Sequence, residues 1–566
     1  GLGVRDRAPG QESDQLGGSY FSQWTGDVPT NANRNTSLTV IMNQPRGVRA
    51  NFGNSTPTTK TWGGTGNWTN DSQWTPPGMP GYLDSVIITG GAVTLSDPAW
   101  VVDVNISTGA TLLFTNWNTV IQARDVTNAG TVTHGQCATF GPTPTASNRV
   151  HFVCSNLTVL AGAAINVDGK GYTPGGPGTP MTGSRAGGSY GGIGGRGGSG
   201  AYDSPAAPFQ PGSCGQGQSD PYSGAGGGQS PGGGCVRLEA AGRVTVDGSI
   251  TAIGRGYSSS DTAGGSGGGI YIACDAFAGT GTLRADGGPV QFDGALTSDP
   301  GGGGGGRVAI LYNTASQAAV SPKSTVRFSV LCGAPSHATP SFSGTMGTLF
   351  FPDDQLLPDT LDSAFSGVLC GFGRWDATGI AVSNAVIQFA DTNFEVAATN
   401  DILFKRPSNY TYRPTLTLSR ILAGRHVIID MGPHPMALTN AAVTCGGDLT
   451  MIPTTTNIST MTIYAGPTNA AGPDYGSLVA VTGNVVVATN CWIYPVSAPT
   501  NGGSVLFRMR DISVSSNAGF NATGRGYYPA GPGNGNAGRA GAGHGGVGGN
   551  VSAPTYGSSN APIQPG

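Results

Sequence analysis

Glycine tracts with a three-residue period constrain the fold of this chain more than any other feature. Residues 191–199 read GGIGGRGGS, so each triplet holds two glycines and one other residue. A left-handed polyproline-type helix has three residues per turn, and only glycine fits where such helices crowd together. The tracts therefore predict a packed set of extended glycine helices whose backbone amides pair between neighbours. A flexible Gly-Ser linker is the alternative, and the interleaved Tyr190, Ile193, Tyr202 and Phe209 argue against it.

Composition narrows the fold class and the kinds of partner. Glycine and proline supply 97 and 39 of the 566 residues, about a quarter of the chain, which excludes ordinary helical domains. Aromatic residues make up 8% and charged residues only 10%, the opposite of a typical disordered chain. The net charge of −3 is too small to attract nucleic acid. No run of about 18 apolar residues occurs, so we expect no membrane insertion in this segment.

Short strands closed by glycine recur from about residue 157 onward. Residues 162–171, 248–256 and 279–288 each place two or three small or aliphatic residues on one face of a strand and then turn on glycine. Stacked coils of a solenoid need this pattern, because each coil buries the next. We predict an all-β fold: a right-handed parallel β-helix or solenoid with polyglycine-II-like insertions and small N-terminal β modules.

A long-range repeat links two distant parts of the chain. DGKGYTPGGPG at residues 168–178 recurs as TGRGYYPAGPG at 523–533, and Tyr172 and Tyr527 differ by 527 − 172 = 355 positions. Tyr190-Gly-Gly matches His544-Gly-Gly, and PFQPG ending at Gly212 matches PIQPG ending at Gly566, where the offset is 566 − 212 = 354. We expect a unit of roughly 355 residues whose second copy continues beyond the given sequence.

The N-terminal region indicates two further β modules. Leu38, Val40 and Met42 alternate before a turn and a second strand at 48–52, which predicts a β-hairpin. This stretch resembles the C-terminal half of the divergent internalin-type B repeat of bacterial surface proteins. The matching residues are Trp24, Gly26, Asp27, Leu38, Val40, Met42, Ala50, Asn51 and Phe52. The resemblance implies that the chain begins inside such a module.

A second module opens at Thr61 with three tryptophans and a proline-glycine turn, and it is similar to the opening of repeat units in large bacterial secreted, autotransporter-like proteins. Together the two resemblances imply a bacterial secreted or cell-surface protein. We predict five segments: 1–55, a partial B-repeat-like module; 56–150, a Trp-rich module leading into the solenoid; 151–320, a glycine-rich β-helix unit; 321–510, further β-helix or a β-sandwich; and 511–566, the start of a second glycine-rich copy.

Candidate binding residues are aromatic. An adhesin could stack glycans on exposed rings, and the candidates for this role are Trp62, Trp68, Trp74, Tyr172 and Tyr527. The nine cysteines form no Cys-x-x-Cys pair, so no zinc or haem site is predicted, and disulfides or buried thiols remain. The candidate disulfides join Cys137 with Cys154 and Cys214 with Cys235. No cofactor or metal is predicted, because His426 and His434 are separated by Gly432 and Pro433 and the Asp-Gly pairs favour turns over calcium.

An enzymatic alternative rests on charged residues in the second half of the chain. A polysaccharide lyase or hydrolase would need carboxylates at a cleft, and the candidates between Asp353 and Asp430 are Asp353, Asp354, Arg406, Arg413, Arg420 and Arg425. Adjacent residues of a strand point to opposite faces, so Asp353 and Asp354 could share a site only on a loop. We predict no catalytic residues and a structural protein of an extracellular fibre, sheath or surface layer, whose partners are neighbouring repeats or its own copies. Adhesion to cell-surface glycans is the second possibility.

Overall fold

The computed structural model describes most of the chain. The described residues are 20–26, 47–53, 57–138, 147–173, 176–181, 184–217, 230–256, 262–290, 300–334, 342–405, 416–432, 436–453, 458–467, 475–499, 502–528, 531–534, 542–548, 555–557, 559–560 and 566. Contacts divide the chain into two compact units, Gly1–Gly347 and Thr348–Gly566. The division falls inside the segment predicted as 321–510.

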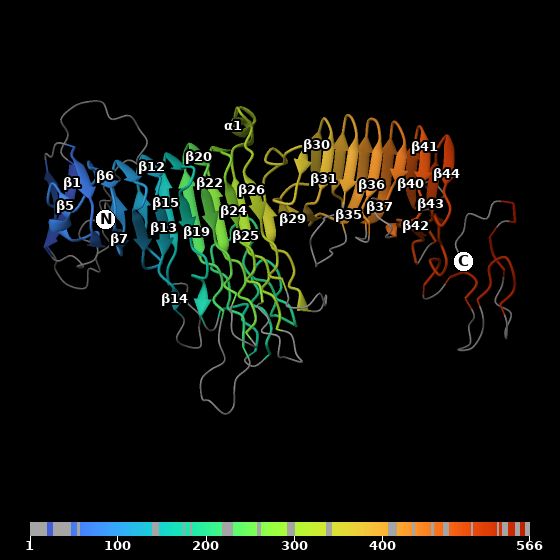
Figure 1. Ribbon diagram of the computed structural model, residues 1–566, viewed down its shortest axis with the longest axis horizontal. Coiled ribbons are helices and arrows are strands. Elements are labelled where there is room, and N and C mark those ends of the chain that lie inside the picture. The colour runs from blue at the N-terminus through green and yellow to red at the C-terminus, as the bar shows by residue number, and fades with distance from the viewer. Residues whose placement is uncertain are drawn as a thin grey trace. The chain divides into compact units, whose positions relative to one another are not determined.

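Unit 1 is built from three ladders of parallel strands, and each successive stretch of chain adds one strand to each ladder (Figure 1). The first ladder contains β3 (Thr59–Trp62), β6 (Ser85–Ile88), β9 (Asp103–Ile106), β12 (Asp125–Asn128), β16 (Asn156–Val159), β20 (Arg243–Val246) and β23 (Ala276–Ala278). The second contains β4 (Thr65–Asn67), β7 (Ala92–Leu95), β10 (Thr111–Phe114), β13 (Thr131–His134), β17 (Ala164–Asn166), β21 (Ser249–Thr251), β24 (Thr282–Arg284) and β26 (Arg327–Ser329). The third contains β8 (Ala99–Trp100), β11 (Ile121–Gln122), β15 (Val150–Cys154), β19 (Cys235–Ala240), β22 (Gly269–Ala273) and β25 (Arg307–Leu311).

Within a ladder, apolar residues of successive strands lie in register. In the first ladder the buried side chains in register are Val86, Val104, Val126, Leu157, Val244 and Phe277. Their strands alternate buried and partly exposed residues, since successive side chains of a strand point to opposite faces. Burying each such side chain contributes about 1.5–3 kcal/mol. The three segments compared in the sequence pair in this way, with Ile165, Ile250 and Leu283 in register.

The remaining elements of unit 1 are short. They are an antiparallel pair β1 (Tyr20–Gly26) and β2 (Val48–Gly53), a strand β5 (Trp74–Thr75) antiparallel to β3, a 3₁₀ turn η1 (Asp71–Gln73), a parallel pair β14 (Cys137–Ala138) and β18 (Tyr172–Thr173), and one helix α1 (Thr314–Ala318). The strand predicted at 48–52 is therefore present and pairs with β1. Leu38, Val40 and Met42, its predicted partner strand, lie outside the described residues, as does Asp27.

Unit 2 repeats the arrangement of parallel ladders. One contains β30 (Arg374–Ala377), β33 (Glu395–Ala398), β35 (Leu416–Ala423), β37 (Met436–Cys445), β40 (Ser477–Val481) and β43 (Val505–Arg508). Another contains β28 (Thr360–Leu361), β31 (Ile380–Ser383), β34 (Ile402–Lys405), β36 (Val427–Asp430), β38 (Leu449–Met451), β41 (Asn484–Val487) and β44 (Asp511–Val514). β39 (Ser459–Tyr464), β42 (Cys491–Val496) and β45 (Gly519–Phe520) continue from the first half of β37, while β27 (Thr348–Phe350), β29 (Ser366–Cys370) and β32 (Val386–Phe389) form a shorter ladder.

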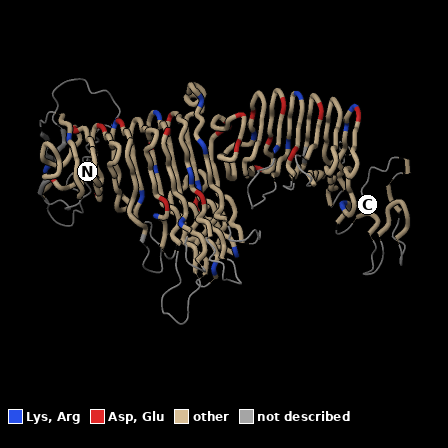
Figure 2. Tube along the Cα trace, in the orientation of Figure 1, with Lys and Arg blue, Asp and Glu red and all other residues tan. Residues whose placement is uncertain are grey.

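The prediction of an all-β fold is confirmed in its coarse form: the described chain is dominated by long parallel sheets, consistent with a β-helix or solenoid. The β-sandwich alternative for 321–510 is wrong for the described part, because sandwich sheets are antiparallel and these ladders are parallel. Many charged residues lie at turns along one edge of each unit (Figure 2). Arg124, between β11 and β12, pairs with Asp103 and Asp125 at 2.9 Å.

Candidate functional site: a bundle of glycine-rich segments

Within the described residues, seven glycine-rich segments of unit 1 leave the ladders and pack against one another. They comprise residues 185–195, 230–234, 252–256, 262–268, 285–290, 300–306 and 342–347, called the glycine bundle below. Figure 1 shows the loops between β18 and β26 extending to one side of the ladders. Most of these residues are buried although they lie in no ladder strand. A buried backbone must pair its N–H and C=O groups, so the pairing in this bundle has to come from neighbouring segments.

The tract 301–306 donates its hydrogen bonds with a period of three. Gly301 and Gly304 donate to the carbonyls of Arg185 and Gly188, both at 2.9 Å. Gly302 and Gly305 donate to Phe342 and Thr345, both at 3.0 Å, and Gly303 and Gly306 donate to Gly288 and Ala285 at 3.1 and 2.7 Å. Every third residue therefore faces the same neighbour, and one tract is joined to three others.

The tract 264–268 shows the same pattern. Gly264 and Gly267 donate to Gly301 and Gly304, both at 3.0 Å. Gly265 and Gly268 donate to Arg255 and Ala252, and Ser266, between them, donates to Ser213. Two neighbouring tracts thus share one geometry, in which the three directions of a three-residue turn each meet a different segment.

Close approach explains why these positions are glycine. A Cβ atom placed on any residue of Gly301–Gly306 would lie 2.0–2.3 Å from a backbone oxygen of another segment. Real Cβ contacts are not that short, and a backbone oxygen cannot move aside as the end of a flexible side chain can. A side chain anywhere in this tract would therefore force the segments apart.

Buried serines occupy some of the positions where a side chain has room. Ser213 N–H donates to Ser266 Oγ at 2.8 Å, and Gly178 N–H donates to Ser213 Oγ at 2.9 Å. Ser189 Oγ accepts from Gly194 N–H at 2.9 Å. All three serines have no exposed surface. Serine hydroxyl groups thus accept hydrogen bonds from backbone amides that do not pair with a carbonyl of a neighbouring tract.

Two tyrosines, Tyr190 and Tyr202, pack against each other in the first copy of the repeat. Tyr190 donates its hydroxyl to Asp203 at 2.8 Å, and its ring centre lies 4.8 Å from that of Tyr202. Arg307 donates to the Tyr202 carbonyl from Nε and Nη2 at 3.0 and 2.9 Å. Burial raises the pKa of both tyrosines well above the usual value. The hydroxyls therefore stay protonated as fixed hydrogen-bond donors.

The second copy, in unit 2, repeats four backbone hydrogen bonds of the first copy. In the first copy the backbone N–H of Tyr172 donates to the carbonyl of Gly212. In the same way the N–H of Ser189 donates to Gly178, that of Tyr190 to Gly192, and that of Tyr202 to Tyr190. In the second copy Tyr527 donates to Gly566, Gly543 to Gly533, His544 to Gly546, and Tyr556 to His544. His544 and Tyr556 pack at 4.7 Å, as Tyr190 and Tyr202 do at 4.8 Å. The repeat seen in the sequence is thus also a repeat of backbone geometry.

The chain matches no known family model, no curated protein and no solved structure. The resemblance to internalin-type and autotransporter-like repeats therefore stays a prediction. No helix among the described residues is long and apolar enough to cross a membrane. The same residues hold no group of three or more His, Cys, Asp or Glu side chains placed to bind a metal ion.

Four of the five predicted glycan-stacking aromatics are in the core, so the prediction that they are exposed is wrong for these four. Trp62, Trp68 and Trp74 are at most 2% exposed and pack edge to face, with ring centres 4.9 and 5.0 Å apart. Two of the indole N–H groups also donate hydrogen bonds, that of Trp62 to the Gly64 carbonyl and that of Trp74 to the Trp68 carbonyl, both at 2.8 Å. Tyr172 is 2% exposed, within β18. Tyr527 alone is half-buried, beside Tyr556.

The predicted disulfides are absent, because all nine cysteines are thiols. The Cys137 thiol donates to the Asn148 carbonyl at 3.3 Å, and the Cys235 thiol donates to the Phe209 carbonyl at 3.4 Å. The Cys214 thiol lies 3.5 Å from Thr179 Oγ1. Burial raises the pKa of Cys154 and Cys235 to about 12. Cys137, Cys214 and Cys235 therefore face backbone or side-chain oxygen instead of their predicted partners.

The charged residues of the enzymatic alternative do not form one cleft. Asp353 accepts from the Gln355 amide at 3.0 Å within its own turn, and Asp354 accepts from the Asp376 amide of β30 at 2.6 Å. Arg420 pairs instead with the buried Glu395 at 2.9 Å, and Arg374 pairs with the same carboxylate. Arg425 lies 3.8 Å from Asp401. Arg406 and Arg413 lie outside the described residues.

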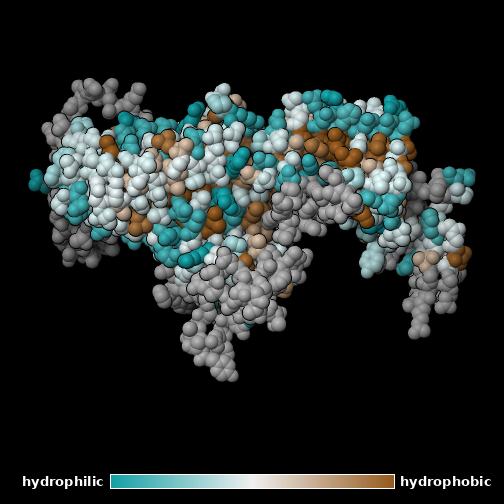
Figure 3. Space-filling view, viewed as in Figure 1, coloured by the Kyte–Doolittle hydropathy of each residue, from teal (hydrophilic) through white to brown (hydrophobic). Residues whose placement is uncertain are grey.

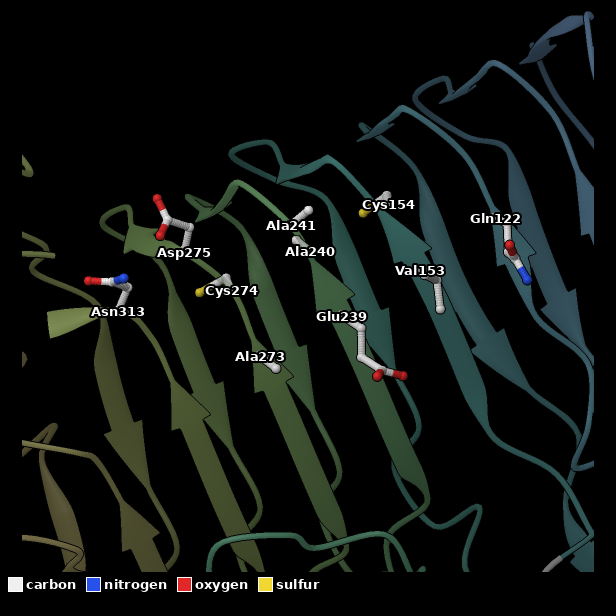
Figure 4. Close-up of a pocket in the computed structure, with 10 residues that line it drawn as sticks. All are labelled: Gln122, Val153, Cys154, Glu239, Ala240, Ala241, Ala273, Cys274, Asp275 and Asn313. Carbon is white, nitrogen blue, oxygen red and sulfur yellow. The ribbon is translucent and has the colours of Figure 1, made fainter. Parts of the chain in front are cut away.

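Two shallow grooves on the ladder faces were not predicted. The first, of about 630 Å³, crosses β15, β19 and β22 and is lined by Gln122, Val153, Cys154, Glu239, Ala240, Ala241, Ala273, Cys274, Asp275 and Asn313 (Figure 4). Glu239 accepts there from His151 at 2.8 Å and from Arg237 at 2.7 Å. Desolvation lowers the pKa of His151 to about 4, which keeps it neutral. His151 and Glu239 are 88 residues apart, and no sequence pattern links them.

The second groove lies in unit 2 and has a mostly small, apolar lining. Arg374, Asp376, Ala377, Thr378, Ala397, Ala398, Thr399, Leu422, Ala423, Gly424 and Thr444 line it. Figure 3 shows a band of apolar residues on the visible face of this unit, below the polar turns. The first groove holds two carboxylates, Glu239 and Asp275, of which Glu239 pairs with His151 and Arg237 and Asp275 accepts from the Ser316 hydroxyl at 2.9 Å. Asp376 is the one carboxylate that lines the second groove among the described residues.

Proposed function

We propose that this chain is a structural component of an extracellular fibre, sheath or surface layer, part of a large bacterial repeat protein. Its parallel ladders would be the coils of a right-handed β-helix, and the glycine bundle would be a polyglycine-II-type brace beside them. The observation that carries the proposal is the recurrence, about 355 residues later, of the same four internal hydrogen bonds. A protein that repeats a whole packing unit gains length without needing a globular partner.

The physical properties of the bundle support a mechanical role. Its segments are joined by backbone hydrogen bonds in three directions, and they carry few side chains that could rearrange. Low charge and buried backbone amides also leave few sites for a protease to enter. Stiffness and reach are therefore the function that this arrangement serves best. Binding of cell-surface glycans has no comparable support, because four of its five proposed aromatics are buried.

Electron microscopy of the native assembly tests the proposal. We expect filaments or a layer with a regular axial repeat, together with a cross-β spacing of about 4.8 Å along the coil axis. Isolated compact particles would contradict a scaffold role. Release of products from a panel of uronic and neutral polysaccharides would contradict a purely structural one.

A further inference from the structure

Four charged or titratable residues gather on the outer face of β15 and β19 in unit 1. Arg149, directly before β15, and Arg237, in β19, are half-buried, and Glu239 accepts from Arg237 at 2.7 Å. His151 is in register with Arg237 and donates to the same carboxylate at 2.8 Å. These four residues are called the arginine cluster below. Because His151 is neutral, the cluster carries one positive charge in excess, in a chain whose net charge is −3.

Arg149 is the cation of the cluster that lacks a partner. Its guanidinium makes no hydrogen bond or ion pair with any described residue, and its Nε is buried. The guanidinium carbon lies 4.6 Å from the centre of the Trp117 ring, which holds the group in place. Burial lowers the pKa of Arg149. A buried donor without an acceptor costs free energy, and an anion bound from solution would supply the acceptor.

Arg237 is held in a way that leaves two of its nitrogen atoms available. Its Nε is bonded to Glu239, and its guanidinium carbon lies 4.5 Å from the centre of the Phe209 ring. Phe209 in turn packs against Tyr271, with ring centres 4.8 Å apart. Among the described residues, neither Nη atom of Arg237 has a hydrogen-bond acceptor. A fixed guanidinium with free Nη groups suits an acid group that accepts two hydrogen bonds side by side.

The groove of about 630 Å³ adjoins the cluster at Glu239, which belongs to both. Gln122 and Asn313 line its two ends, and the small apolar residues Val153, Ala240 and Ala273 lie between them (Figure 4). The groove thus crosses the strands from β11 to the end of β25, roughly 19 Å at a spacing of about 4.8 Å per strand. Such a lining gives room for sugar rings, and the amides can bond their hydroxyl groups.

The carboxylates of the groove leave the cluster available to an acid group. Glu239 is neutralised by Arg237, and Figure 4 shows its side chain directed away from Asp275. Asp275, near Asn313, accepts from the Ser316 hydroxyl at 2.9 Å. An acidic ligand would therefore place its charge at the arginine cluster and its uncharged parts along the groove.

We propose that the arginine cluster binds the acid groups of an acidic polysaccharide, whose sugar rings lie in the adjoining groove. A sugar chain fits this face better than an acidic peptide, because β15, β19 and β22 are each paired on both sides. They offer no free edge to which a peptide could add as a strand. The site goes beyond the structural role and uses none of the five aromatic residues predicted to stack glycans.

Calorimetric titration of the full chain tests the inference. The probes are a galacturonic acid oligosaccharide and a sulfated galactan oligosaccharide, each beside its neutral counterpart, the methyl ester or the unsulfated chain. We expect saturable binding of at least one acidic probe and none of the neutral ones. Arg149→Gln should weaken that binding about tenfold or more, since it removes a charge-assisted hydrogen bond. Arg149→Lys should recover part of the affinity, because it keeps the charge and loses the paired geometry.

Arg243→Gln is the matched control, because it removes the same charge from an exposed residue of β20, in another ladder. Its affinity should equal that of the native chain, and an equal loss would reduce the effect to overall charge. Failure of both acidic probes to bind the native chain would remove the site. Equal binding of a polyglutamate peptide would replace the polysaccharide with an acidic polypeptide, and competition by acetate at the same carboxylate concentration would leave a simple anion site. Unchanged thermal unfolding of Arg149→Gln would confirm that its weaker binding is not a loss of fold.

Discussion

The first glycine-rich copy, residues 168–212, and the second, residues 523–566, have closely matching sequences and internal hydrogen bonds but different surroundings. Gly188 and Gly192 in the first copy are buried and donate to neighbouring tracts, whereas their equivalents in the second, Ala542 and Gly546, are exposed. The turn within each copy is therefore determined locally, by the tyrosine or histidine contacts and the glycines beside them. The lateral packing is determined by other segments, which the first copy meets in unit 1.

The largest expected effect comes from placing the same side chain in both copies. Gly191→Val should destabilise unit 1 by on the order of 4 kcal/mol or more, because its Cβ would overlap the Gly306 backbone at 2.1 Å. Gly545→Val should change the stability of unit 2 by less than about 1 kcal/mol, because no described atom lies near it. Denaturant unfolding, monitored by hydrogen exchange at amides of each unit, measures both changes in stability. Equal losses in the two variants would show that the surroundings do not distinguish the copies.

Acid should destabilise unit 1, which contains the first copy, through the buried His134. His134 is fully buried against the bundle: its Nδ1–H donates to the Gly135 carbonyl at 2.6 Å and its Nε2 accepts from the Cys235 amide at 3.0 Å. Desolvation lowers the pKa of His134 from 6.5 to about 4. A group whose pKa is lower in the folded state binds its proton more readily when unfolded. The contribution of His134 to the free energy of unfolding is therefore complete above pH 6.5 and falls as the pH approaches 4. The total decrease in this free energy is about 3 kcal/mol.

The pH dependence is measured by unfolding unit 1 between about pH 7 and pH 4, the range that spans the folded and unfolded pKa values. His134→Gln keeps an acceptor for the Cys235 amide and removes the titration, so its stability should depend less on pH over that range. His151, whose pKa desolvation also lowers to about 4, adds a similar dependence and requires its own variant, His151→Gln. A slope that persists unchanged in both variants would place the acid sensitivity elsewhere in unit 1.

The sequence predicted the elements that follow from local pattern. Ile165, Ile250 and Leu283 could be aligned because each precedes the same glycine turn, and they stack in register. The period of the glycine tracts predicted amides paired between neighbours, and the offset of about 355 residues located the second copy. In each case the residues that carry the pattern also make the contact.

The errors arose where contacts join distant segments. Tryptophans in a polar, turn-rich stretch suggested exposed rings, but the antiparallel β5 returns Trp74 onto Trp62 and buries both. Cys137 and Cys154 are near in sequence, yet each thiol is oriented by its own strand. The His151 to Glu239 pair was missed because the glycine-rich insertion puts 88 residues between two rungs that lie side by side.

The smallest expected difference in stability is between substitutions of Tyr190 in the first copy and of the equivalent His544 in the second. Tyr190→Phe removes a buried hydroxyl that donates to Asp203 at 2.8 Å, so it should cost about 1–2 kcal/mol and leave an acceptor unpaired. His544→Phe replaces the equivalent ring in the second copy, where the buried Nε2 has no hydrogen-bond partner among the described residues. That change keeps the ring contact with Tyr556 at 4.7 Å and removes an unsatisfied polar atom. Its effect should therefore be within about 0.5 kcal/mol or slightly stabilising, as measured by denaturant unfolding of each unit. A larger loss for His544→Phe than for Tyr190→Phe would mean that the imidazole, not its surroundings, maintains the turn of the second copy.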